Sequence, residues 1–207
     1  MLKLIDDADR RVCQQDTDLC IEGFPRSANS FTFNILKQAN PDCKIVSHSH
    51  QIDNIKLAVA YGIPTIILIR SPIQAVASFC VFKHPIDRVD LLVKKWISYY
   101  RNISKLREQV VIIDFEIATK DINLAIKKLN ETYTKEFKLV EDLDRVKDEF
   151  FAARKAQYME SSDRKIVRQV SIPVSDRSNL KKHYVALLEK HPEMETALEI
   201  YTDLISV

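Results

Sequence analysis

The amino-acid sequence predicts a three-layer α/β/α fold with a central parallel sheet and a helix-rich C-terminal half. Apolar segments with the composition of buried strands recur along the chain, and a helical pattern follows them. Residues 65–69, Thr-Ile-Ile-Leu-Ile, are typical of a parallel strand buried on both faces, so we expect this strand at the centre of the sheet. The 207 residues include only two glycines, Gly23 and Gly62, which also indicates a high helix content.

The chain opens with a strand, a helix and a second short strand. Residues 19–24 are apolar, and Pro25 cannot continue strand pairing. We expect a helix to open at about residue 30 and to end before the turn at Pro41, because the apolar positions between them suit a core-facing helix. A second strand is expected at 44–46.

Helices flank the central strand. Residues 52–61 have helical periodicity, and Gly62 and Pro64 end that helix. A further helix is expected at 73–79, with Pro72 near its first turn.

Helices dominate the rest of the chain. We expect an amphipathic helix at 89–106, whose aromatic residues Trp96, Tyr99 and Tyr100 belong to the core, and then a strand at 110–116. Further helices are expected at 121–129, 136–158 and 177–190, and a short one after Pro192. Ser175-Asp176 can cap the helix at 177–190. We expect the charges of 136–158 to form a solvated face.

Length and charge bound the possible functions. The length suits one domain, residues 1–207, with a real core. The 31 Lys and Arg residues nearly balance the 29 Asp and Glu residues, and the net charge of +2 provides no general attraction to nucleic acid or to an anionic membrane. We therefore expect neither as a partner, and any anion must be bound by local geometry.

The cysteines and the apolar runs indicate a cytoplasmic protein. The four cysteines form no C-x-x-C pair and have no histidine at zinc spacing, which favours buried free thiols and no metal site. Residues 1–18 are too charged for a signal peptide, and no apolar run approaches the roughly 20 residues that span a bilayer.

The turn between the first strand and the first helix has the features of an anion-binding site. A strand, a turn of small residues and a helix N-terminus point free N–H groups at one spot, where the helix dipole favours negative charge. Ser27, Asn29 and Ser30 can add donors, and Arg26 adds a planar charge suited to phosphate or sulfate. The alternative is that Asn29 or Ser30 merely caps the helix and that Arg26 is solvated. The turn lacks the Walker A pattern and its lysine, which disfavours ATP or GTP hydrolysis.

A second arginine turn follows the central strand. Arg70 stands at the carboxyl end of 65–69, and Ser78 lies further along the next helix. Ligands of open α/β sheets collect at the carboxyl edge, so two arginine turns there favour a ligand with two separated anionic groups. The alternative for Arg70 is an exposed loop arginine.

These stretches together resemble the sulfotransferases that use 3′-phosphoadenosine 5′-phosphosulfate (PAPS). The family loop P-K-S-G-T-T, followed by an aromatic residue or leucine, is similar to residues 25–31, Pro-Arg-Ser-Ala-Asn-Ser-Phe. The family motif R-x-P-x-x-x-x-x-S is similar to Arg70 through Ser78, and a histidine after the second strand is similar to His50. A strand ending in an aromatic-acidic pair is similar to Phe115-Glu116. The likeness covers roughly residues 19–130.

The resemblance implies roles for specific residues. The residues implied for the 5′-phosphosulfate are Arg26, Ser27, Ala28, Asn29, Ser30 and Phe31, and those implied for the 3′-phosphate are Arg70 and Ser78. Arg26 stands where most members have lysine, and Ala28 where they have glycine. The late R-K-G motif of the family is not legible, and the candidates for its anionic contact are Arg164, Lys165, Arg168 and Arg177.

The implied reaction moves a sulfuryl group from PAPS to a hydroxyl or amine of a small-molecule or glycan acceptor, without a metal. Arg26 is expected to stabilise charge on the bridging oxygen, and His50 to take the acceptor's proton, with His48 as the competing base. Two other classes stay open. One is a P-loop-like nucleotide or small-molecule kinase, and the other is a non-catalytic nucleotide-binding module.

Overall fold

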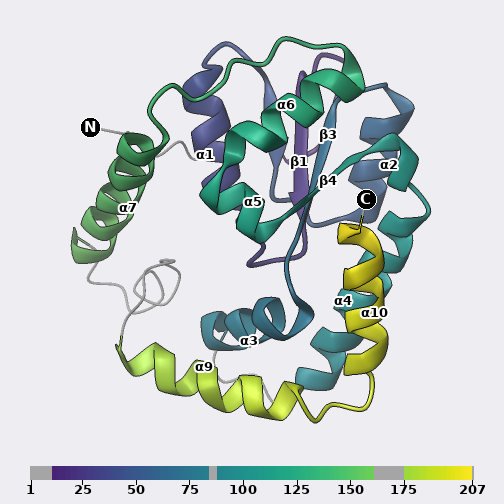
Figure 1. Ribbon diagram of the computed structural model, residues 1–207, viewed down its shortest axis with the longest axis vertical. Helices are drawn as coiled ribbons and strands as arrows, with labels where there is room; N and C mark the ends of the chain where they lie inside the picture. The colour runs from purple at the N-terminus through teal and green to yellow at the C-terminus, as the bar shows by residue number, and fades with distance from the viewer. Residues whose placement is uncertain (1–10, 84–87, 161–174, 207) are drawn as a thin grey trace.

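A four-stranded parallel sheet forms the centre of the molecule (Figure 1). The structure is a computed structural model, and it describes residues 11–83, 88–160 and 175–206. The strand order is β2-β1-β3-β4. The strands are β1 (Leu19–Gly23), β2 (Ile45–Ser47), β3 (Thr65–Ile69) and β4 (Val111–Asp114). β3 has the predicted bounds, is buried throughout and pairs with β1 on one side and with β4 on the other. The predicted α/β fold with a central parallel sheet is confirmed.

Helices cover both faces of this sheet. They are α1 (Asn29–Ala39), α2 (Ile52–Ala60), α3 (Pro72–Lys83), α4 (Val89–Ser104), α5 (Phe115–Lys120), α6 (Ile122–Tyr133), α7 (Leu143–Glu160), α9 (Ser175–Leu188) and α10 (Met194–Ile205). A 3₁₀ turn, η1 (Arg107–Gln109), precedes β4. The long helical second half agrees with the sequence prediction.

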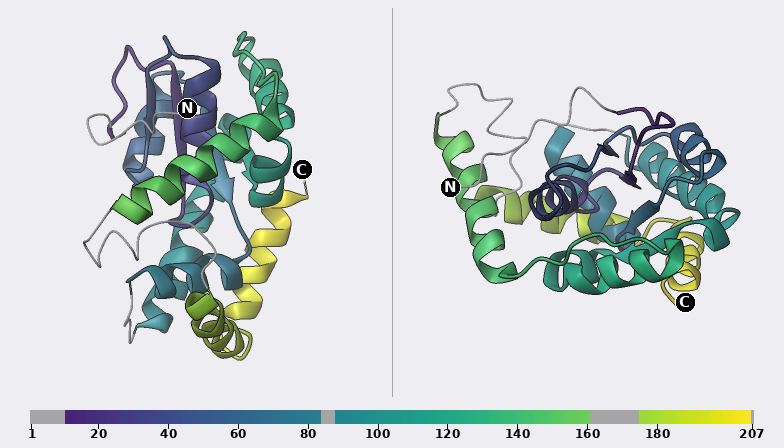
Figure 2. Two further views of the ribbon diagram at one scale, coloured as in Figure 1. Left: turned by 90° about the vertical axis from the view of Figure 1, so that its left-hand side faces the viewer. Right: turned by 90° about the horizontal axis from the view of Figure 1, so that it is seen from above.

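The two faces of the sheet build two cores, because successive side chains of a strand point to opposite sides. Ile66 and Leu68 of β3 pack in the core formed with α1, α5, α6 and α7. Ile67 and Ile69 pack in the core formed with α2, α3, α4, α9 and α10. Figure 2 shows the sheet between these two layers.

Two aromatic residues of α4 anchor the second layer to the sheet. Trp96 and Tyr100 are fully buried, as the sequence predicts. The Tyr100 hydroxyl donates a hydrogen bond to the carbonyl oxygen of Leu68 at 2.7 Å and accepts one from the amide of Phe24 at 3.2 Å. It therefore links β1 and β3 at the point where β1 leaves the sheet.

The close approach of β1 and β3 explains the glycine at the end of β1. A Cβ atom at Gly23 would lie 2.4 Å from the carbonyl oxygen of Leu68, which is a hard overlap with backbone. Any side chain here would push β1 away from β3, so the strand end requires glycine.

The predicted strand 110–116 is too long. β4 ends at Asp114, and Phe115 and Glu116 form the first turn of α5. The Asp114 carboxylate accepts the amide hydrogen of Glu116 at 2.8 Å and so acts as an N-cap, which stops the strand and starts the helix. The aromatic-acidic pair therefore lies at a helix start and not at a strand end.

The predicted helix 136–158 begins later than expected. α7 starts at Leu143, where the Asp142 carboxylate caps it by accepting the amide hydrogen of Arg145. Before that point, Asn130 and Asn123 of α6 pair through their side-chain amides with the backbones of Phe137 and Val140. These side-chain hydrogen bonds replace the backbone bonds that a helix would have made.

The chain ends with two helices at the predicted places. α9 starts at Ser175, and α10 follows Pro192. The side chains of Ser175 and Asp176 lie outside the described residues, so their predicted capping role stays a prediction. Within residues 11–83, 88–160 and 175–206, no helix is long and apolar enough to cross a membrane.

Candidate functional site

The predicted site lies at the carboxyl edge of the sheet. β1 leads into the turn 24–28 and β2 into the segment 48–50, while Arg70 follows β3 and Asp114 ends β4. All strands are parallel, so these four strand ends meet at one edge.

The turn before α1 leaves the N-terminus of the helix without a side-chain cap. The N-cap residue is Ala28, whose backbone is left-handed with φ 73°, and no side-chain hydrogen bond caps the helix. Asn29 instead donates to the carbonyl oxygen of Phe24 at 3.2 Å, and the Ser30 hydroxyl bonds to His48. The structure therefore does not support the alternative that Asn29 or Ser30 serves as the cap, and the first N–H groups of α1 have no side-chain cap within the described residues.

Arg26 and Ser78 lie together. The Arg26 Nε donates to the Ser78 hydroxyl at 3.2 Å, and its guanidinium lies 5.1 Å from the ring centre of Phe82. Arg26 itself has a left-handed backbone, with φ 74°. These contacts connect the first turn to α3 and bring residues implied for two different anionic groups into direct contact.

Arg70 follows β3 and lies at the same edge of the sheet. Its Nη1 donates to the carbonyl oxygen of Arg26 at 3.0 Å, and its guanidinium lies 3.8 Å from the ring centre of Phe115. Burial lowers the pKa of Arg70 from its ordinary value, while the carboxylates of Glu116 and Asp114 oppose this shift. Arg70 is partly buried against an aromatic ring, so the exposed-loop alternative does not describe it.

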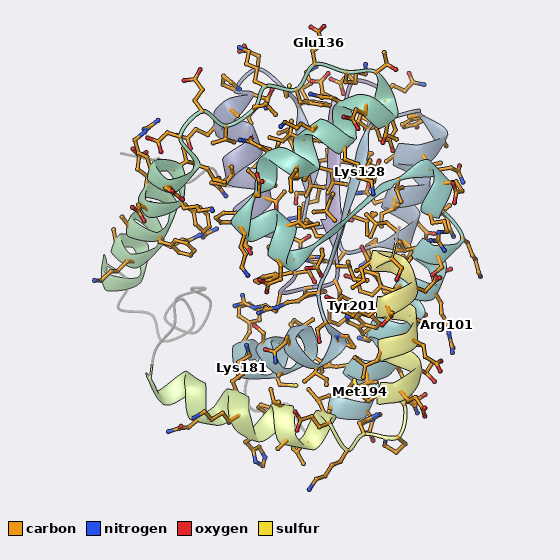
Figure 3. The ribbon with its side chains drawn as sticks, in the orientation of Figure 1. Arg101, Lys128, Glu136, Lys181, Met194 and Tyr201 are labelled. Atoms are coloured by element: carbon orange, nitrogen blue, oxygen red, sulfur yellow. The ribbon has the colours of Figure 1, made fainter. Side chains whose placement is uncertain are left out.

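Lys181 of α9 is a third cation at this site, and the sequence pattern did not predict it. Burial lowers the pKa of Lys181, and the positive charges of Arg70 and Arg26 lower it further. Lys181 therefore lies within electrostatic reach of both arginines, on the helix that packs beneath α3 (Figure 3). No sequence motif separates Lys181 from its neighbour Lys182, which is exposed. Only the packing of α9 on α3 identifies it.

Two histidines follow β2, and each contacts the first turn or its strand. The His48 Nε2 lies 2.9 Å from the Ser30 hydroxyl, and the His50 Nδ1 lies 2.7 Å from the carbonyl oxygen of Gly23. The ring centres of His48 and His50 are 5.8 Å apart. Since a carbonyl can only accept, His50 Nδ1 carries a hydrogen, and Nε2 of the neutral ring is the basic nitrogen.

The surroundings keep the His50 ring neutral to a lower pH than usual. Burial is the largest cause that lowers the pKa of His50, and His48 and Arg11 add to it. The Gly23 carbonyl and the Glu22 carboxylate act in the opposite direction. A base with a lowered pKa is available for proton transfer across the neutral pH range.

Glu22 is a buried carboxylate next to this histidine segment, and its role was not predicted from the sequence. It is 0% exposed and accepts the amide hydrogens of Ser49 and His50, both at 2.9 Å. The Asn54 side chain donates a third hydrogen bond at 3.2 Å. An acidic residue inside the apolar run Leu-Cys-Ile-Glu-Gly was the available sequence signal.

A search of solved structures finds the same architecture in mouse sulfotransferase SULT7A1 complexed with PAP. The TM-score is 0.55 at 12% sequence identity, and the match covers 97% of this chain and 86% of that chain. The fold is that of a sulfotransferase. No protein-family model and no curated protein sequence matches the chain.

The residues of this sulfotransferase-like edge fit a ligand with two anionic groups. Arg26, Arg70 and Lys181 converge on it, and the positive charges of the two arginines disfavour the charged form of Lys181. A bound anion would offset this repulsion, and the uncapped N-terminus of α1 favours an anion as well.

Other predicted residues take different places. Phe31 is buried in a ring cluster with Phe150 and Phe151 of α7, at centre-to-centre distances of 5.2 and 6.2 Å, so its side chain serves packing. Ser27 is fully buried in the turn. Arg164, Lys165 and Arg168 lie outside the described residues, as does the side chain of Arg177. Within the described ranges, no group of His, Cys, Asp or Glu is arranged to hold a metal ion.

Proposed function

We propose that this protein is a sulfotransferase that moves a sulfuryl group from PAPS to a hydroxyl or amine of a small-molecule or glycan acceptor. The observation that carries this proposal is the convergence of Arg26, Arg70 and Lys181 beside the uncapped N-terminus of α1, with His50 on the neighbouring strand end. The fold shared with a PAP-bound sulfotransferase supports it.

Different residues of the chain bind the two anionic groups of PAPS. The N–H groups of α1 and Arg26 bind the 5′-phosphosulfate, and Arg70 with Lys181 binds the 3′-phosphate. PAPS supplies the sulfuryl group and leaves as PAP. Arg26 stabilises the negative charge that develops on the bridging oxygen, and this type of stabilisation is commonly a large share of catalysis.

His50 removes the proton of the acceptor. As the acceptor oxygen or nitrogen forms its bond to sulfur, the bond between sulfur and the bridging oxygen breaks, and PAP keeps that electron pair. The acceptor proton goes to His50 Nε2, since Nδ1 already holds a hydrogen that it donates to Gly23. The imidazolium then releases this proton to solvent. His48 is the competing base, and its hydrogen bond to Ser30 places it nearer to the anion-binding turn.

A ligand screen by thermal shift tests the proposal. PAP and PAPS should raise Tm much more than AMP or ATP, because two anionic anchors need two anionic groups, and a ligand at 100 times its Kd adds about 2.7 kcal/mol of stability. Transfer of labelled sulfur from PAPS to a panel of hydroxyl and amine acceptors then tests catalysis.

The screen separates the rival functions. Equal stabilisation by AMP and PAP would overturn the two-anion site. Tight PAP binding without transfer to any acceptor would favour a non-catalytic nucleotide-binding module. Turnover with ATP and Mg²⁺ would favour a kinase.

A further inference from the structure

The carboxylate of Glu22 is fully buried beside His50. A buried charge is costly unless hydrogen bonds or an opposite charge compensate it. Three N–H donors, from Ser49, His50 and Asn54, point at its two oxygens, which is the pattern of an ionised carboxylate. The His50 ring is a basic group close to this carboxylate, with His50 Nδ1 4.0 Å from Glu22 Oε2.

The same carboxylate holds a strained segment. His48 and His50 have left-handed backbones, with φ 67° and 54°. This conformation costs a non-glycine residue roughly 1–2 kcal/mol and persists where the surroundings enforce it. The amides that Glu22 binds belong to Ser49 and His50, so one side chain fixes the backbone between the two strained positions and at the second of them.

Asn54 of α2 orients the Glu22 carboxylate. Its side-chain amide donates to Glu22 Oε1 at 3.2 Å, and its carbonyl oxygen accepts the amide hydrogen of Cys13 at 2.8 Å. The network therefore runs from α2 through β1 to the histidine segment, and each step is a hydrogen bond of ordinary length.

We propose that Glu22 is the positioning carboxylate of the base, which fixes the backbone around His50 and stabilises the imidazolium that forms when His50 takes the acceptor's proton. The 4.0 Å separation between Glu22 Oε2 and His50 Nδ1 is short enough for a charge-charge interaction in a buried site. Proton balance is unchanged, because Glu22 stays ionised throughout and the proton resides on His50 Nε2. This inference rests on the proposed function.

The direction of the pH effect follows from the groups around His50. Burial, His48 and Arg11 favour the neutral ring, whereas Glu22 and the Gly23 carbonyl favour the imidazolium. Removing the Glu22 charge therefore lowers the pKa of His50 further, and the ring gains its proton at a more acidic pH.

The test uses the full-length Glu22→Gln variant, which keeps the shape of the side chain and removes its charge. The imidazole signal of His50, assigned by its loss in His50→Ala, is titrated by NMR in both proteins. The midpoint should fall by about one pH unit in Glu22→Gln, because an opposite charge at this range shifts a pKa by roughly 1–3 units. The acid limb of the kcat profile should move in the same direction, while PAP stabilisation is retained. An unchanged His50 midpoint would overturn the inference.

Glu22→Asp separates the effect of the charge from the effect of side-chain length. It also replaces Glu22→Gln as the test variant if that protein does not fold. It keeps the charge but withdraws it from the amides of residues 49 and 50, so kcat should fall by less than the roughly 10²- to 10⁴-fold of losing a base. A wild-type kcat in Glu22→Asp would overturn the positioning role. The NMR midpoint does not depend on turnover. A wild-type protein that transfers no sulfuryl group would therefore contradict the proposed function, while the His50 titration would still test the interaction between Glu22 and His50.

Discussion

Arg70 Nη1 donates a hydrogen bond to the backbone carbonyl of Arg26 at 3.0 Å, which joins two turns that the sequence separates by 44 residues. The bond holds the end of β3 against the turn that leads into α1. The two arginine turns therefore meet at one place on the carboxyl edge of the sheet.

Arg70→Ala should weaken PAP binding by roughly ten- to a hundredfold, because a charge-assisted hydrogen bond contributes about 1.5–3 kcal/mol. AMP lacks the 3′-phosphate and should lose little. Isothermal titration with both ligands measures the difference, and Arg101→Ala, an exposed arginine of α4 labelled in Figure 3, is the matched control. Equal losses for AMP and PAP would mean that Arg70 acts on the fold or on the adenosine.

Lys181→Met should raise the Tm of the ligand-free protein and at the same time weaken PAP. Burial and the two arginines lower the pKa of Lys181, so its charged form is disfavoured in the folded state. This penalty is fully present at pH values below the folded pKa and decreases to zero as the pH rises from there to the unfolded pKa, so the Tm gain should be larger at neutral than at strongly alkaline pH.

Exposed Lys182 provides the control for this change, since Lys182→Met should alter neither Tm nor PAP affinity appreciably. Thermal melts with and without PAP at several pH values measure both effects. A Lys181→Met protein with unchanged PAP affinity would remove Lys181 from the anion site.

Arg26→Ala should lower kcat by more than it raises the KM for PAPS. An interaction made in the transition state affects kcat, and removing one such donor typically costs about 10²–10³-fold. Steady-state kinetics with Arg26→Lys as the charge-conserving control measure this. If the change were confined to KM, Arg26 would be an anchor for the ground state alone.

His50→Ala should abolish turnover and leave PAP affinity nearly unchanged, because the ring contacts Gly23 and not the anion-binding cations. His48→Ala should be milder and should weaken PAP slightly through the lost contact with Ser30. Single-turnover assays and PAP titrations of both variants distinguish them. Near-wild-type kcat in the His50 variant would transfer the role of base to His48 or to an acceptor amine that needs none.

Ala28→Gly should stabilise the protein by about 0.5–1 kcal/mol. A left-handed alanine costs roughly 1–2 kcal/mol, and the greater flexibility of glycine in the unfolded chain returns part of the difference. Ala152→Gly, at an exposed position inside α7, should instead destabilise by about 1 kcal/mol. Urea unfolding of both variants measures the contrast, and a loss of stability at position 28 would contradict the strain.

The sequence predicted best where local composition decides the structure. The run 65–69 is β-branched at every position except Leu68 and apolar after Thr65, so its strand bounds came out as expected. It failed at 110–116 and at 136–142, where Asp114, Asn123 and Asn130 impose structure through side-chain hydrogen bonds that periodicity does not detect.

The site shows the same division. The positions of Arg26 and Arg70 at this edge could be predicted because each follows a strand in a recognisable turn. Lys181 and Glu22 were missed, since their importance comes from packing between elements that are distant in sequence. Lys181 depends on where α9 lies, and Glu22 on which face of β1 meets α2.

The Tyr100 hydroxyl bridges Phe24 and Leu68, so the residue that begins the turn 24–28 is held to α4 and, through it, to β3. The conformational entropy of this turn is therefore lost during folding and not when a ligand arrives. Such preorganisation means that the free and the occupied protein should share one backbone around α1. Affinity should then depend on the match of charges, and ligands with a different spacing of their anions should be rejected, because the turn does not adjust to them.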